Sequence, residues 1–207
     1  MIEFGITERG DAGLDHAWLR HAGPVIAITK SPQLLPVPLR DNVIVHCTIT
    51  GFGGTYLEPG VATTAVTLAA YRNIVAAIGG ERCVLRVDPI IPTERGLALA
   101  KSIIAQRLGR VRISYIDNYP RLGFRLPWTT FHAPNRPQLP DCEICGEPGL
   151  QCTGCVSERD FRALGIPLPL LPILKGQRMA CKCLAEKTEL LSNRKPCLHG
   201  CLYCYWR

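Results

Sequence analysis

The stretch that decides the fold runs from residue 43 to residue 87. It contains the apolar run Val-Ile-Val-His-Cys-Thr-Ile-Thr at 43–50, an alanine-rich segment at 60–78, and a second apolar run, Cys-Val-Leu-Arg-Val, at 83–87. The two β-branched runs predict buried strands. Apolar residues of the middle segment recur with the period of a helix, which Gly79 and Gly80 end. A strand, a helix and a second strand in this order form a parallel β/α unit, so we expect an α/β fold.

The same alternation continues on both sides of this unit. Thr93 can cap a second predicted helix, Glu94 lies in its first turn, and Gly109 ends it. Other apolar runs have the length and the β-branched composition of strands. The further predicted strands are residues 2–7, 25–29 and 111–116, and the further predicted helices are residues 12–21 and 93–108.

Polar residues follow each predicted strand. In parallel β/α folds the loops at the carboxyl ends of the strands converge on one face, where the chemistry collects. Each of these residues can also be read as an ordinary loop residue or an ion-pair partner. They are Glu8, Arg9 and Asp11 after the first strand, Lys30 after the second, Thr50 and Gly51 after the third, Arg86 and Asp88 at the fourth, and Asp117 and Asn118 after the fifth.

Eleven cysteines in 207 residues are the strongest compositional signal. Residues 1–10 lack a basic segment followed by an apolar one, and no apolar run is long enough to span a bilayer, so we expect a cytosolic protein. In a reducing compartment such a density of cysteine indicates metal binding rather than disulfides. Cys47 and Cys83 lie inside apolar runs and are expected in the core, whereas the other nine cysteines fall within residues 142–204.

Four of these nine form two Cys-x2-Cys pairs in a proline-rich segment that follows Arg125. Two such turns can complete the tetrahedral thiolate shell of one zinc ion, and a second iron–sulfur cluster is the alternative. The segment resembles the first half of a MYND-type or HIT-type zinc finger. The predicted ligands are Cys142, Cys145, Cys152 and Cys155.

The last three cysteines have a different spacing, Cys197-x3-Cys201-x2-Cys204, with Tyr203 before the third. Three thiolates on a 4Fe-4S cluster leave one iron without a protein ligand and open to reaction. This loop resembles that of radical S-adenosylmethionine (SAM) enzymes. Together with a preceding Cys-x-Cys pair, and with residues 6–11, 28–32, 48–53 and 85–90, it resembles an uncharacterised bacterial family of radical SAM proteins that carry the cluster loop last. The loop is also similar to that of spore photoproduct lyase.

The resemblance implies a partial (β/α)6 barrel of the radical SAM type. Because the loop comes last, the barrel is expected to be permuted, with residues 188–192 as the strand that delivers the chain into the loop. The expected organisation is a partial barrel at 1–126, a Cys-rich metal-binding insertion at 127–180, and a closing strand with the cluster loop at 181–207. An incomplete barrel has an open side that would admit a bulky substrate or a partner subunit.

The resemblance also implies the activity, in which a reduced cluster cleaves SAM and the resulting 5′-deoxyadenosyl radical abstracts hydrogen from a substrate. An electron donor such as flavodoxin or ferredoxin would reduce the cluster. Tyr203 is expected near the adenine, and Cys181 and Cys183 are expected either to join an auxiliary cluster or to have no ligand role. The candidates for orienting SAM or substrate are Arg86, Asp88, Lys30 and Asp117, and the cofactor-binding candidates are Thr50 and Gly51.

Charge is distributed unevenly along the chain. The first hundred residues hold 8 Lys and Arg against 9 Asp and Glu, and the remainder holds 16 against 8. A basic second half suits nucleic acid, and a lesion or modified base is the leading substrate expectation, with a peptide or a small metabolite as alternatives. Two rival readings are a non-catalytic zinc or iron–sulfur module that binds nucleic acid or protein, and a radical SAM fold whose cluster is only structural.

Overall fold

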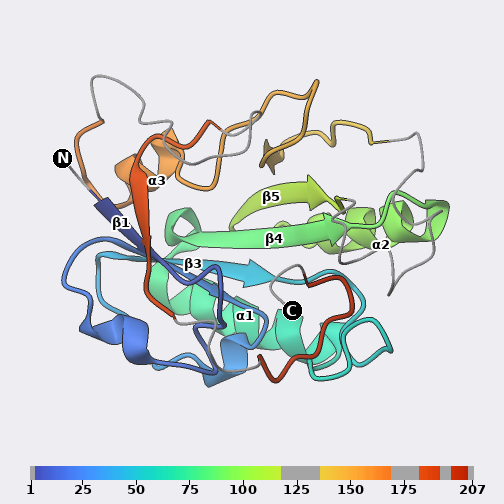
Figure 1. Cartoon of the computed structure of the whole chain (residues 1–207), viewed down its shortest axis with the longest axis horizontal. Helices are drawn as coiled ribbons and strands as arrows, with labels where there is room; N and C mark the ends of the chain where they lie inside the picture. Colours follow the sequence, from blue (N-terminus) through green and yellow to red (C-terminus); the bar gives the residue numbers. More distant parts are fainter. Residues whose placement is uncertain (1–2, 118–135, 169–181, 192–196, 205–207) are drawn as a thin grey trace.

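Seven parallel strands form one curled sheet, which makes half of a barrel (Figure 1). The computed structural model describes residues 3–117, 136–168, 182–191 and 197–204. The order of strands across the sheet is β6-β5-β4-β3-β2-β1-β7. Their bounds are β1 Glu3–Ile6, β2 Val25–Thr29, β3 Val43–Thr48, β4 Cys83–Ile90, β5 Arg110–Tyr115, β6 Glu143–Ile144 and β7 Glu186–Glu189.

All five strands predicted in residues 2–116 are present, and the expected α/β class is confirmed. The strand expected at 188–192 begins earlier, as β7, and pairs in parallel with β1 from Glu3↔Glu186 to Ile6↔Glu189. The last strand of the chain therefore lies beside the first. The expected count of six strands is wrong, because β6 adds a seventh beside β5. It has two residues and includes a charged one, so it carries no strand pattern.

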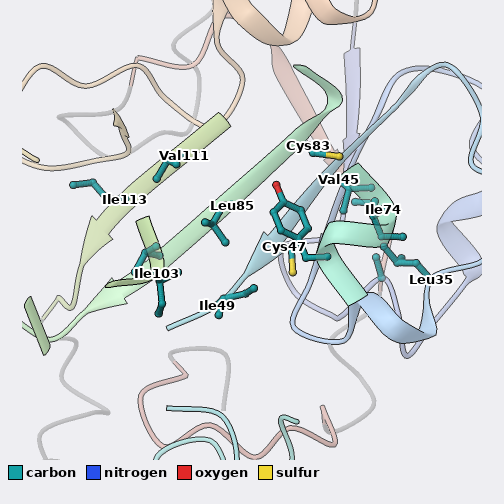
Figure 2. Packing of buried hydrophobic residues seen from close by; sticks show 14 of the residues in the cluster. Leu35, Val45, Cys47, Ile49, Ile74, Cys83, Leu85, Ile103, Val111 and Ile113 are labelled. Atoms are coloured by element: carbon teal, nitrogen blue, oxygen red, sulfur yellow. The ribbon is translucent and has the colours of Figure 1, made fainter. Parts of the chain in front are cut away.

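Helices α1 (Thr64–Ile78) and α2 (Glu94–Ile104) pack on the same face of the sheet. Thr93 caps α2 by accepting a hydrogen bond from the Gly96 amide, as expected. Cys47 and Cys83 are fully buried in the core between these helices and the sheet, which confirms their structural role (Figure 2). Within the described residues no helix is long and apolar enough to cross a membrane.

The helix predicted at 12–21 is wrong. Only a short 3-10 helix, η1 (Ala17–Arg20), forms there. The Asp11 carboxylate accepts a hydrogen bond from the Gly13 amide at 2.8 Å, and this local turn competes with a helical start. The turn is fixed further by Trp18, which is fully buried and donates its indole N–H to the Ala12 carbonyl at 2.9 Å.

The opposite face of the sheet, here called the inner face, packs against the cysteine-rich segment at β1 and β2. Helix α3 (Glu158–Ala163) places Phe161 against Phe4 of β1, with ring centroids 5.2 Å apart. Ile26 and Ile28 of β2 join the same buried cluster. The segment after residue 136 therefore shares a core with the half-barrel, and it contributes β6 to the sheet.

A buried network of charges holds this segment in place. Arg110 of β5 donates to Glu143 of β6 at 2.8 Å and to Asp160 of α3 at 2.8 Å. Arg112 also pairs with Glu143, and Ser157 at the start of α3 hydrogen-bonds to Arg110. Burying a charge costs several kcal/mol unless it is paired, so β5, β6 and α3 are constrained to pack together.

Replacing Glu143 should show how much this network contributes. Glu143→Gln keeps the shape but removes one of the two carboxylates that balance Arg110 and Arg112, leaving Asp160, and we expect a loss of about 3 kcal/mol in the free energy of unfolding. Glu158→Gln, which breaks the exposed pair with Arg162, should cost less than about 0.5 kcal/mol. Urea denaturation measures both. Equal losses in the two variants would contradict a dominant buried network.

The same carboxylate predicts acid sensitivity. Burial raises the pKa of Glu143, but the hydrogen bond and charge of Arg110 and the charge of Arg112 outweigh it and lower the pKa to about 2, from an ordinary value of 4.5. Because the pKa of Glu143 is lower in the folded state, its ionised carboxylate stabilises the fold fully at pH values above the unfolded-state pKa of 4.5. This contribution to the free energy of unfolding is lost as the pH falls from 4.5 towards 2. The stability difference between wild type and Glu143→Gln should therefore shrink over that window in urea titrations at successive pH values.

Candidate functional site

The loop of residues 197–204 lies at the carboxyl edge of the sheet, against the connection between β3 and α1 (Figure 1). The Leu202 amide donates to the Leu57 carbonyl at 3.0 Å, and the Gly60 amide donates to the His199 carbonyl at 2.9 Å. A Cβ on Gly60 would lie 2.3 Å from the Leu198 oxygen, so only glycine permits this approach. Two segments far apart in sequence are thus joined through their backbones.

Asp11 is the anchor of this arrangement. It follows β1, is almost fully buried, and accepts hydrogen bonds from the Gly13 amide, the Thr29 hydroxyl, the Lys30 amide and the His199 Nε2, at 2.6–2.8 Å. Burial raises the pKa of Asp11, but the hydrogen bond and charge of His199 and the Lys30 amide outweigh it and lower the pKa overall. The carboxylate therefore fixes β2 and the cysteine loop at one point.

His199 contacts acceptors through both ring nitrogens. Nε2 faces the Asp11 carboxylate, and Nδ1 lies 3.2 Å from the Gly60 carbonyl. The ring is therefore held between the Asp11 carboxylate and the Gly60 backbone.

Lys30 and Tyr203, both predicted site residues, are in direct contact. Lys30 Nζ donates to the Tyr203 hydroxyl at 2.9 Å and to the Glu58 carboxylate at 2.7 Å, with only 15% of the lysine side chain exposed. Burial lowers the pKa of Lys30, but the charges of Glu58 and of the Cys201 sulfur outweigh it and raise the pKa overall. Glu58 is a site residue that the sequence did not reveal, because its only signal is one carboxylate in a glycine-rich loop.

The three cysteines of the loop differ in exposure. Cys201 is buried beside Leu57, Ile116 and Tyr203, whereas Cys197 and Cys204 are partly exposed. Burial raises the pKa of Cys201 to about 12, the Lys30 charge opposes this, and the sulfurs of Cys204 and Cys197 add to the rise. The three sulfurs are therefore close enough to influence one another. Any metal they bind must displace protons, which makes binding pH-dependent.

Three cysteines of one short loop are donors that a 4Fe-4S cluster can use. Among the residues the structure describes, no three His, Cys, Asp or Glu side chains converge to hold one metal ion. A 4Fe-4S cluster takes each cysteine on a different iron, so its ligands need not meet at a point. Three thiols on one loop, beside a buried ammonium that can offset their negative charge as thiolates, are compatible with such a cluster.

Arg86 and Asp88 form an ion pair on the inner face of β4. Burial lowers the pKa of Arg86, but Asp88 and then the sulfur of Cys145 outweigh it and raise the pKa. Asp88 also acts on Lys30, raising its pKa. The charges of this pair therefore interact both with Lys30 of the loop site and with Cys145.

The other strand-end candidates have local partners. Asp117 lies 3.6 Å from Arg136, and the Thr50 hydroxyl accepts a hydrogen bond from the Phe52 amide at 3.2 Å. Gly51 has a φ of +88°, and an added Cβ would lie 3.3 Å from Ile103 and from Leu99 of α2. Thr50 and Gly51 thus shape the turn that brings Phe52 against the cluster of apolar residues around Tyr203.

The four cysteines expected to share one zinc ion lie in two different clusters. Cys142 and Cys152 pack with the core on the helix-covered side, whereas Cys145 and Cys155 belong to the cluster on the inner face, with Cys183. The Cys152 thiol is hydrogen-bonded to the backbone of Glu147. It accepts from the Glu147 amide at 3.2 Å and donates to the Glu147 carbonyl at 3.1 Å. The structure therefore does not bring these four together. Cys181 and Asn118 lie outside the described residues.

Comparison with known proteins adds no functional information. No protein-family model, curated protein or solved structure matches this chain.

Removal of the His199 side chain should release the loop. In His199→Ala the Asp11 contact is lost, and we expect the amides of Leu202 and Cys204 to exchange with deuterium about tenfold faster, equivalent to about 1.4 kcal/mol of local opening. His16→Ala serves as the control, because the His16 ring hydrogen-bonds to the Gly13 and Leu34 carbonyls and not to Asp11 among the described residues. Hydrogen exchange read by mass spectrometry measures both. Unchanged exchange in residues 197–204 would show that the anchor is not needed.

Proposed function

We propose that the protein is a radical SAM enzyme whose 4Fe-4S cluster is held by Cys197, Cys201 and Cys204. The observation that carries the proposal is the position of this three-cysteine loop. It lies at the carboxyl edge of a curled parallel sheet, where β/α proteins gather their reacting groups. A cysteine loop that served only as a structural knuckle would not need to be fixed there by Asp11 and Gly60.

The cluster, with SAM on its open iron, would supply one-electron cleavage of the sulfonium and a 5′-deoxyadenosyl radical. The chain's own residues bind, orient and shield. Cys201 is held in an apolar environment that excludes water, and Tyr203 is fixed by Lys30 so that its ring can flank the adenine. Lys30 places a positive charge beside Cys201, where it offsets negative charge on thiolate ligands.

The Arg86–Asp88 pair is the proposed orienting group for SAM or substrate, because it lies on the inner face and acts electrostatically on Lys30. The placement of β7 beside β1 supports a permuted radical SAM barrel, in which β7 is the strand that leads into the cluster loop. A flavodoxin or ferredoxin would supply electrons. A nucleic-acid lesion or modified base is the proposed substrate class, since the second half of the chain is basic.

Anaerobic reconstitution tests the proposal. The full chain is loaded with iron and sulfide, its iron, zinc and sulfide are counted, and dithionite and SAM are added. We expect about four iron atoms per chain at this loop and release of 5′-deoxyadenosine. Cys201→Ala should lose the cluster and reduce 5′-deoxyadenosine at least about tenfold.

Cys83→Ala is the matched control, because Cys83 is equally buried but lies in the core away from the loop. It should keep both the iron and the 5′-deoxyadenosine. A chain that binds zinc and no iron would refute the proposal. A 4Fe-4S electron paramagnetic resonance signal that SAM leaves unchanged would assign the cluster a structural role instead.

A further inference from the structure

A second group of thiols lies on the inner face, away from the loop. The sulfurs of Cys155 and Cys183 are 3.2 Å apart, and the backbone amide of Cys155 donates to the Cys183 sulfur at 3.2 Å. Cys145 is hydrogen-bonded to Cys155 through its side chain. The proposed radical chemistry uses none of these three residues.

The backbone is built for this close approach. Gly154 has a φ of +78°, and a Cβ there would lie 2.6 Å from the nitrogen of Cys183. The Leu184 amide donates to the Val156 carbonyl at 2.9 Å, and Arg112 donates to the Cys155 carbonyl at 2.9 Å. The two cysteines are therefore held opposite each other by main-chain contacts on both sides.

The surroundings favour a reactive Cys155. Lys187 of β7 places its ammonium 3.1 Å from the Cys155 sulfur. A cysteine sulfur beside a lysine ammonium and 3.2 Å from a second cysteine sulfur is the arrangement of a nucleophilic cysteine with its resolving partner.

We propose that Cys155 and Cys183 form a reversible dithiol–disulfide site whose oxidant is a low-molecular-weight disulfide. The Cys155 thiolate attacks one sulfur of the small disulfide, whose S–S bond breaks and releases one small thiol after protonation. Cys183 then attacks the Cys155 sulfur of the mixed disulfide, and its proton leaves with the second small thiol. Two protein thiols are oxidised, and one small disulfide is reduced to two thiols.

The disulfide would link Cys155, just before α3, to Cys183, just before β7. The two residues are 28 positions apart in the sequence. Because the cysteine loop follows β7, the disulfide would tie the insertion covalently to the segment that leads into the candidate site. Bond formation needs the sulfurs to move from 3.2 Å to about 2.05 Å. This inference does not depend on the radical SAM proposal.

The test uses the full reduced chain in glutathione buffers of defined ratio. Free thiols are trapped by alkylation, and peptides are identified by mass spectrometry with fragmentation. Cleavage after Lys182 separates Cys181 from Cys183, so the pairing can be assigned. We expect a Cys155–Cys183 cross-link, lighter by two hydrogen atoms, that dithiothreitol reverses.

Variants order the steps. Cys183→Ser should accumulate a glutathione adduct on Cys155, Cys155→Ser should form no cross-link, and Cys83→Ala should behave as wild type. Lys187→Met should slow cross-linking about tenfold. If both cysteines stay alkylated in oxidised glutathione, or if Cys155 pairs with Cys145, the site is wrong. Zinc or iron that the wild type retains and both serine variants lose would also overturn it. Formation of the cross-link by the wild-type chain in the glutathione buffers tests the proposal even if a variant fails to fold.

Discussion

The carboxylate of Asp11 is the contact on which the geometry of the site depends. It lies at the end of β1 and receives donors from the start of the following turn, from the end of β2 and from His199 of the cysteine loop. One buried acceptor therefore sets the relative position of two strand ends and the candidate ligands.

A second set of charges decides what covers the inner face of the half-barrel. Arg110 and Arg112 lie on β5 where an apolar side chain would be the simpler choice, and they are balanced by Glu143 and Asp160 from the cysteine-rich segment. Ion pairs as well as apolar packing therefore hold the cysteine-rich segment on the inner face. The segment also carries Cys145 and Cys155 into the interior, close enough to Arg86 to alter its pKa.

The sequence predicted what local patterns encode and missed what depends on distant partners. The five strands in residues 2–116 and the helices α1 and α2 follow from runs of apolar residues with a clear period, and Lys30 and Tyr203 came from their places after a strand and within a loop. Two-residue β6 has no period, and its Glu143 is placed beside Arg110 and Arg112, which lie more than 30 positions earlier in the chain.

The misses at the site have the same cause. Glu58 looks like a loop carboxylate until Lys30 is placed next to it. The four cysteines at 142–155 have zinc-like spacing, but Cys142 and Cys145, which flank β6, pack in different clusters, a placement that spacing alone does not predict. Cys183 joins Cys155 through pairing across 28 positions, which no local pattern could indicate.

The half-barrel ends in two edges that differ in character. At one edge, β7 consists of Glu186, Lys187, Thr188 and Glu189, all of them at least partly exposed. Charged side chains on an edge strand discourage another strand from pairing with it, because their solvation would be lost. Among the residues that the structure describes, β7 is therefore an edge strand poorly suited to continuing the sheet through backbone hydrogen bonds with another strand. Association at this side would have to use side chains rather than continue the sheet.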